Sequence, residues 1–199
     1  GGINEQYGIY QEDVDDMNYF FGEVTLKTDG GGVPNKINFE EASIIGEKEL
    51  ETNVVKEIRN TKIFSFYQSK TLSEIHWSHY LRYIIKNFYI RYLEESNIKE
   101  SGITKISSVD ILKYEAGGFY KIHSDDHTKF PRILSVIIFL NNDYEGGELN
   151  FHDPVTKKIY KTIKPVPGRC VMWPSNFMYP HSVSPVTKGI RYSIVSWLN

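Results

Sequence analysis

The second half of this 199-residue chain is a succession of short segments rich in β-branched and aromatic residues, each bounded by turn residues. Eight such segments follow Gly102: SSVDILKYE, FYKIHSD, RILSVIIFLNN, ELNFHD, KKIYKTIKP, RCVMWPS, HSVSPV and IRYSIVSWLN. Eight short, closely spaced strands predict a β-sandwich or a β-barrel. The fold of this chain must therefore be built mainly from antiparallel sheet.

A long amphipathic pattern precedes the strands, from about Leu72 to Glu95. Large apolar residues recur in it at helical spacing: Trp77, Leu81, Ile84, Phe88 and Tyr92. We interpret this stripe as core packing and assign Ser73 as the N-cap. A helix that comes before a set of strands indicates an α+β layout, in which the helix covers one face of the sheets.

The length fits one domain, residues 1–199. Within it we expect an N-terminal extension without an assigned role at 1–45 and a segment of helical support at 46–104. The β core is expected at 105–199. Residues Val55–Ser69, which include Arg59 and Lys62, are predicted to form a substrate lid.

Charge and hydropathy exclude several kinds of partner. The net charge is -2 and there is no polybasic run, so we expect no nucleic-acid partner. The longest apolar run, Ile133–Leu140, is too short to cross a bilayer, so we expect no membrane partner. Cys170 is the single cysteine, which fits an intracellular, cytoplasmic location.

Two histidines and two acidic residues are crowded into the stretch GGFYKIHSDDH, Gly117–His127. In an extended chain His123 and Asp125 project to the same side, so both could bind one metal ion. Taken alone, the HxD pattern more often marks a polar strand end. His181, at the beginning of a later strand, is the best candidate for a third ligand. Two histidines and one carboxylate suit Fe(II) and leave coordination positions open, whereas a structural zinc site favours thiolates.

Arg191 follows His181 by ten residues, with Pro185 and Gly189 between them. We expect a turn there, with two antiparallel strands that bring His181 and Arg191 opposite each other and into the interior. A buried guanidinium needs an anion, and the stretch KGIRYSIVSW contains no acidic residue. The simplest anion is the carboxylate of a small molecule whose other end binds the metal. The alternative is a surface arginine on an edge strand.

Several longer motifs carry a family resemblance: YEAGGFYKIHSD, RILSVIIFLNNDYEGGELNF, Pro167-Gly168 and HSVSPVTKGIRYSIVSW. Together they resemble the Fe(II)/2-oxoglutarate-dependent dioxygenases, in particular the prolyl 4-hydroxylase branch. The resemblance covers about residues 105–198, and EIRNTKIFSF at Glu57–Phe66 is similar to a segment that precedes the long helix of that family. It implies a distorted double-stranded β-helix, a cupin-like jelly-roll, with supporting N-terminal helices.

The resemblance also implies site residues. Three of them would be the catalytic Fe(II) ligands: His123, Asp125 and His181. Four would bind or lie near the cosubstrate 2-oxoglutarate: Arg191, Tyr114, Ser135 and Trp197. Arg191 would hold its distal carboxylate, with hydroxyls from Tyr114 or Ser135, because Phe139 replaces a tyrosine found in some members and offers no hydrogen bond.

By the same resemblance, the expected reaction uses O2 and 2-oxoglutarate to hydroxylate an unactivated C–H bond, with release of succinate and CO2. The expected substrate is a prolyl residue in a protein or peptide, and ascorbate is an expected reductant. The presence of Asp125 favours hydroxylation over halogenation. The alternatives are a hydroxylase of a free amino acid, another small molecule or peptidyl lysine, and a non-catalytic cupin-like metal-binding barrel.

Overall fold

The computed structural model describes residues 2–4, 9–12, 40–41, 44–45, 52–53, 56–69, 71–129 and 131–199. Most of the expected N-terminal extension lies outside these residues, as does Val55 of the expected lid. The described part has one α-helix, α2 (Leu72–Glu95), and a short 3-10 helix, η1 (Phe66–Gln68). We expected more than one supporting helix, but the described pieces between residues 40 and 53 are two-residue strands.

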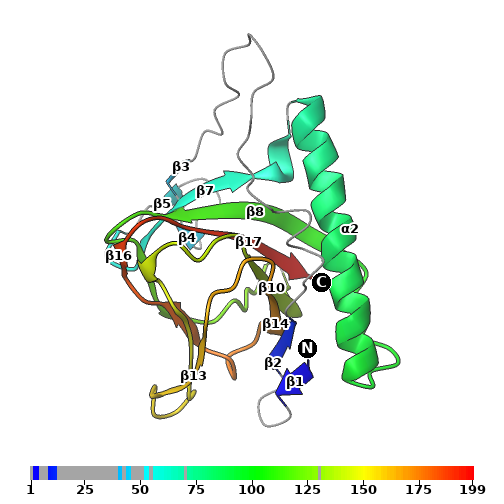
Figure 1. Ribbon diagram of the computed structural model, residues 1–199. Coiled ribbons are helices and arrows are strands. Elements are labelled where there is room, and N and C mark those ends of the chain that lie inside the picture. Colours follow the sequence, from blue (N-terminus) through cyan, green and yellow to red (C-terminus); the bar gives the residue numbers. More distant parts are fainter. Residues whose placement is uncertain are drawn as a thin grey trace.

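Two antiparallel sheets make up the body of the molecule (Figure 1). The larger sheet has the spatial order β1 (Gly2–Asn4), β2 (Ile9–Glu12), β14 (Cys170–Pro174), β10 (Leu134–Phe139), β17 (Arg191–Leu198), β8 (Ile106–Tyr114), β7 (Lys62–Ser65) and β3 (Glu40–Glu41). The smaller sheet has the order β13 (Ile159–Ile163), β12 (Leu149–His152), β15 (His181–Val183), β9 (Phe119–His123) and β6 (Arg59–Asn60). Two short pairs are separate: β11 (Glu145–Gly146) with β16 (Val186–Lys188), and β4 (Ile44–Ile45) with β5 (Thr52–Asn53).

The central strand β10 is buried along its whole length because both of its faces are covered. Val136 and Ile138 belong to a core shared with α2, while Ile137 and Phe139 belong to a second core shared with the smaller sheet. Side chains alternate between the two faces of a strand, which explains this division and the unbroken apolar run in the sequence. The larger sheet thus has the helix on one face and the smaller sheet on the other. This is the predicted jelly-roll arrangement with helical support.

Helix α2 has the predicted bounds, but its N-cap differs from the prediction. Thr71, not Ser73, accepts the hydrogen bond from the Glu74 backbone, and the Glu74 side chain accepts one from the Thr71 N–H. This is a capping box, which satisfies two backbone donors that the first turn leaves free. Trp77 is 36% exposed and packs edge-on against neighbouring rings, so it is not a core residue, whereas Leu81 and Phe88 are buried as predicted.

The segment predicted to be a lid is built into both sheets. Strand β6 pairs with β9 at the edge of the smaller sheet, and β7 pairs with β8 in the larger one. Between them, the Thr61 hydroxyl donates to the Lys113 carbonyl and the Asn60 side chain to the Gly117 carbonyl. These bonds join the two sheets along one side of the barrel. Among the described residues, no helix has the length and apolar character needed to span a membrane.

Candidate active site

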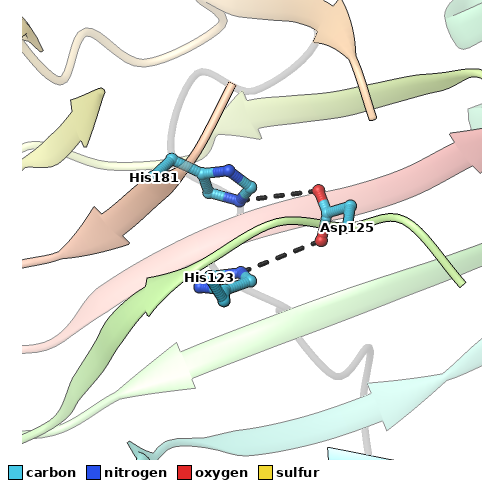
Figure 2. Close-up of side chains that lie close together, drawn as sticks. All are labelled: His123, Asp125 and His181. Carbon is cyan, nitrogen blue, oxygen red and sulfur yellow. Dashed lines mark ion pairs between the residues drawn. The ribbon is translucent and has the colours of Figure 1, made fainter. Parts of the chain in front are cut away.

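Three side chains from separate parts of the sequence meet between the two sheets (Figure 2). His123 ends β9, Asp125 follows two residues later, and His181 begins β15, where it pairs directly with His123. The Nε2 atoms of His123 and His181 lie 3.8 and 3.5 Å from the two carboxylate oxygens of Asp125. One nitrogen from each imidazole and one oxygen from the carboxylate all lie within 4.8 Å of one another.

Backbone carbonyls orient both imidazoles. The Nδ1 atom of His123 lies 2.8 Å from the Lys121 carbonyl oxygen, and Nδ1 of His181 lies 3.1 Å from the Tyr179 carbonyl oxygen. Because a carbonyl only accepts, each Nδ1 must carry the proton. The Nε2 lone pairs are then free and point toward Asp125, which is how metal-binding histidines are normally held.

The Asp125 carboxylate is fixed by neighbours that are not themselves metal ligands. The Ser135 hydroxyl donates to Asp125 Oδ2 over 2.6 Å and is itself 2.8 Å from the Ser175 hydroxyl. Arg132 Nη1 donates to the Asp125 backbone carbonyl over 3.3 Å. These bonds place the carboxylate, which lies beyond the end of β9 in irregular chain, as firmly as a strand would.

The site holds its groups in the protonation states that metal binding requires. Burial, followed by the nearby His181, lowers the pKa of His123 to about 3, so its imidazole is neutral at physiological pH. Burial alone would raise the pKa of Asp125, but His181 and His123 outweigh it, and the pKa lies below the ordinary value. A neutral imidazole and an ionised carboxylate are the forms that bind divalent cations.

The sequence interpretation left Tyr120 out of the site, yet its ring stacks on that of His123 at a centroid distance of 3.6 Å. The reason is a β-bulge. His181 pairs with His123 and Val183 with Tyr120, so β9 has one residue more than β15 over this interval. The extra residue brings Tyr120 and His123 to the same face, against the simple alternation that we applied. The sequence contains no recognisable signal for this bulge.

Arg191 is fully buried in the second core, but its position differs from the prediction. It begins β17 and pairs with Tyr114 of β8, whereas His181 lies in the smaller sheet. The predicted hairpin between His181 and Arg191 is therefore wrong, because β16 intervenes and pairs with β11. The two side chains instead come from facing sheets, so both still belong to the interior.

The Arg191 guanidinium has unsatisfied donors. Its Nη1 atom donates to the Ser193 hydroxyl over 3.0 Å, while Nε and Nη2 are buried without a hydrogen-bond partner among the described residues. The guanidinium carbon lies 4.9 Å from the Tyr114 ring centroid and 5.3 Å from that of Phe139. A buried cation with free donors and aromatic walls fits an anion that is absent from the protein chain itself.

The structure places Ser135 and Trp197 away from Arg191. They pair with each other across β10 and β17, and Trp197 is six residues beyond Arg191 on β17, roughly 20 Å along an extended strand. Ser135 binds Asp125 instead, which corrects its predicted contribution to the Arg191 carboxylate site. Trp197 is near the metal end, since the Arg132 guanidinium carbon lies 3.8 Å from its ring centroid. Of the predicted hydroxyls, only Tyr114 lies beside Arg191.

The two parts of the site are a short distance apart. Gly147 is next to the Arg191 side chain, and Phe151, four residues later, pairs with His181. The Cα atoms of Gly147 and Phe151 are at most roughly 14 Å apart. The donor set of two imidazoles and a carboxylate fits Fe(II) with open coordination positions.

Comparison with known proteins agrees with this geometry. Residues 109–199 match the model of the 2OG-Fe(II) oxygenase superfamily. The chain is similar to this superfamily over these residues, which are a little under half of its length. The matched range contains His123, Asp125, His181 and Arg191. The resemblance predicted from the sequence is thereby confirmed for residues 109–199.

Proteins similar to this chain include a PKHD-type hydroxylase of Synechococcus sp. (strain JA-2-3B'a(2-13)), 37% identical over 101 residues, which are 47% of this chain and 43% of that protein. Human prolyl 3-hydroxylase 2 is 38% identical over 66 residues, 33% of this chain and 9% of that protein. The chain thus spans less than half the length of these curated relatives. Among solved structures, a Trichoplax adhaerens prolyl hydroxylase in complex with a hypoxia inducible factor oxygen degradation domain peptide fragment shares the fold, with a TM-score of 0.63 and 22% identity over 80% of this chain and 70% of that one.

Proposed function

We propose that this protein is an Fe(II)- and 2-oxoglutarate-dependent dioxygenase that hydroxylates a prolyl residue in a protein or peptide. The single observation that carries the proposal is that one barrel contains a two-histidine, one-carboxylate cluster and a buried arginine with two donors that have no hydrogen-bond partner among the described residues. The match of residues 109–199 to the superfamily model and the similarity to prolyl hydroxylases support it. Residues 105–199 carry the catalytic core in this proposal, and residues 56–104 support it.

Each part of the site has a defined role in this proposal. His123, Asp125 and His181 would hold Fe(II), and Arg191 would bind the distal carboxylate of 2-oxoglutarate. Bound Fe(II), together with 2-oxoglutarate and O2, supplies the oxidation of a C–H bond to an alcohol while the cosubstrate becomes succinate and CO2. Ser135 keeps the Asp125 carboxylate in place, and the backbone carbonyls keep both Nε2 atoms available.

The surroundings of the metal ligands suit a peptide substrate. The Arg59 guanidinium carbon lies 4.7 Å from the centroid of the Tyr120 ring that stacks on His123, and Arg132 lies over Trp197. Arg59 Nε and Trp197 Nε1 are buried donors without a hydrogen-bond partner among the described residues. Backbone carbonyls are strong acceptors that every peptide offers, so these donors would position the chain on both sides of a target proline.

The test is an assay of purified, Fe(II)-loaded protein with 2-oxoglutarate and ascorbate on a panel of peptides that contain proline or lysine. We expect proline peptides to gain the mass of one oxygen atom, with one succinate formed per hydroxylation. Matched peptides with alanine at the target position should gain nothing. Fragmentation and comparison with 3- and 4-hydroxyproline standards would place the new hydroxyl.

Two results would contradict the proposal in different ways. Succinate formation coupled to lysine or free amino acids, but never to proline, would refute the prolyl substrate and keep the reaction class. A protein that binds metal yet forms no succinate with any substrate would support the non-catalytic barrel. The single cysteine, Cys170, is buried, and a cytoplasmic location remains a prediction.

A further inference from the structure

Beside Arg191, position 139 holds a phenylalanine, whereas some members of the resembled family have a tyrosine hydroxyl there. Phe139 lies against the guanidinium, and its ring cannot donate. Ser193 is occupied, because its hydroxyl accepts the bond from Arg191 Nη1. A carboxylate has four lone-pair directions, so two free donors of one guanidinium satisfy it only in part.

The Tyr144 side chain lies beside the Arg191 side chain. A Cβ atom built on Gly147 would be 3.0 Å from Arg191 Cδ and 3.2 Å from Tyr144 Cε2, so both side chains converge on this glycine. The Tyr144 hydroxyl is buried and has no hydrogen-bond partner of normal geometry among the described residues. Burial raises the pKa of Tyr144, while the positive charge of Arg191 and a hydrogen-bonding interaction of its guanidinium with the Tyr144 hydroxyl oppose the rise. The two groups are therefore close neighbours, and the Tyr144 hydroxyl keeps its own proton to donate.

The backbone holds Tyr144 in place. On one side, Gly189 packs so closely that an added Cβ would be 3.1 Å from Tyr144 Cα. Just before it in the chain, Asn141 donates to the Ile190 carbonyl over 2.7 Å and accepts from the Tyr192 N–H over 2.7 Å. The segment that carries Tyr144 is thus tied to the chain that leads into Arg191. Two rigidly placed groups leave their polar atoms unsatisfied in one buried space.

We propose that the Tyr144 hydroxyl donates a hydrogen bond to the distal carboxylate of 2-oxoglutarate beside Arg191, in place of the hydroxyl that Phe139 lacks. This inference rests on the proposed function and extends it. The three unsatisfied polar atoms, Arg191 Nε, Arg191 Nη2 and Tyr144 Oη, are all satisfied by one carboxylate. Tyr144 is then a cosubstrate-binding residue with no direct part in the oxidation.

The experiment measures ligand affinity by calorimetry on Mn(II)-loaded protein, so that no turnover is needed. The ligands are 2-oxoglutarate and 2-oxopentanoate, which has the same chain length and 2-oxo acid group but no distal carboxylate. We expect Tyr144→Phe to raise the Kd for 2-oxoglutarate about 10-fold or more, the usual effect of losing a hydrogen bond to a charged group. Its Kd for 2-oxopentanoate should equal that of the unmodified protein. Tyr160→Phe, at another partly buried tyrosine of the same core, is the matched control and should change neither Kd.

A second variant tests whether a tyrosine hydroxyl at position 139 can replace the one at position 144. Phe139→Tyr in the Tyr144→Phe background should recover much of the lost affinity for 2-oxoglutarate. An unchanged Kd for 2-oxoglutarate in Tyr144→Phe would overturn the inference while leaving the proposed function intact. An equal loss for both ligands would show a structural role and would also overturn it. If the unmodified protein binds metal but not 2-oxoglutarate, the proposed function fails together with this inference.

Discussion

At the scale of single residues, Asp125 is the center of the candidate site. It is in contact with both histidines and is held by Ser135 and Arg132. The carboxylate supplies the one negative charge among the three candidate ligands, and a divalent cation is attracted to this charge more strongly than to an imidazole. The adjacent Asp126 is exposed.

We therefore expect Asp125→Asn to weaken Mn(II) binding by more than about 100-fold, beyond the range seen when residues that merely support metal ligands are changed. The shape of the side chain is retained, so the loss would come from the charge. Metal titration followed by electron paramagnetic resonance measures it. Asp126→Asn is the control and should bind Mn(II) as the unmodified protein does. Equal binding by both variants would remove Asp125 from the site.

The lowered pKa of His123 gives the metal-free protein a defined response to acid. Its value in the fold is about 3, below the ordinary value of 6.5, so as the pH falls the unfolded chain takes up this proton before the folded one does. Stability contributed by His123 is complete above about pH 6.5 and is lost progressively below it. Asp125, whose pKa is also lowered, affects stability only below about pH 4.

Between about pH 6.5 and pH 5 we expect the metal-free protein to lose up to about 2 kcal/mol through His123. Urea unfolding across this interval measures the loss. His123→Gln should show a clearly smaller dependence, because glutamine does not titrate. His79→Gln, at an exposed position on α2, should retain the original dependence. If all three proteins respond alike, the assignment of the acid response to His123 is wrong.

At the scale of elements, two residues near the N-terminus of α2 are candidates for its N-cap, Thr71 and Ser73. Ser73 is a plausible N-cap by residue type, but Thr71 has the extended backbone of a cap and completes the capping box with Glu74. Thr71 and Ser73 are only two residues apart, which is within the usual uncertainty of a helix boundary predicted from sequence. The hydrogen bonds between Thr71 and Glu74 identify Thr71 as the N-cap.

Thr71→Ala should lower the free energy of unfolding by about 1 kcal/mol, since it leaves backbone donors of the first turn unsatisfied. Chemical denaturation followed by circular dichroism gives this value. Ser73→Ala provides the matched comparison, with an expected change within about 0.5 kcal/mol. A larger effect at Ser73 than at Thr71 would reverse the assignment of the cap.

At the scale of the whole molecule, the candidate site joins the two sheets. The histidines belong to the smaller sheet and Arg191 to the larger one, while β6 and β7 connect them at one side. A ligand that bridges metal and guanidinium therefore binds the folded barrel but not the unfolded chain. Binding of that kind adds directly to stability.

Mn(II) and 2-oxoglutarate together should raise the melting temperature by about 10 to 20 °C at 100-fold excess over Kd, from a gain of about 2.7 kcal/mol for each bound ligand. Thermal unfolding with and without ligands tests this. Mn(II) should be required for the effect of 2-oxoglutarate, and Asp125→Asn should abolish both shifts. A shift produced by 2-oxoglutarate alone would indicate a binding site that does not involve the metal.

The sequence by itself determined the class of the fold, the helix bounds and the choice of His123, Asp125, His181 and Arg191 as candidate site residues. These features depend on local periodicity and on residue types whose chemistry is restrictive, so they can be derived from short stretches. The strand segments and the position of α2 follow in the same way.

Only the tertiary structure decided which strands face each other and which side chains meet. The β9 bulge brings Tyr120 onto His123, pairing in different sheets separates His181 from Arg191, and a close approach at Gly147 brings Tyr144 to the guanidinium. Strand register and bulges depend on long-range pairing, which leaves almost no local trace, and a shift of one residue turns a side chain to the opposite face.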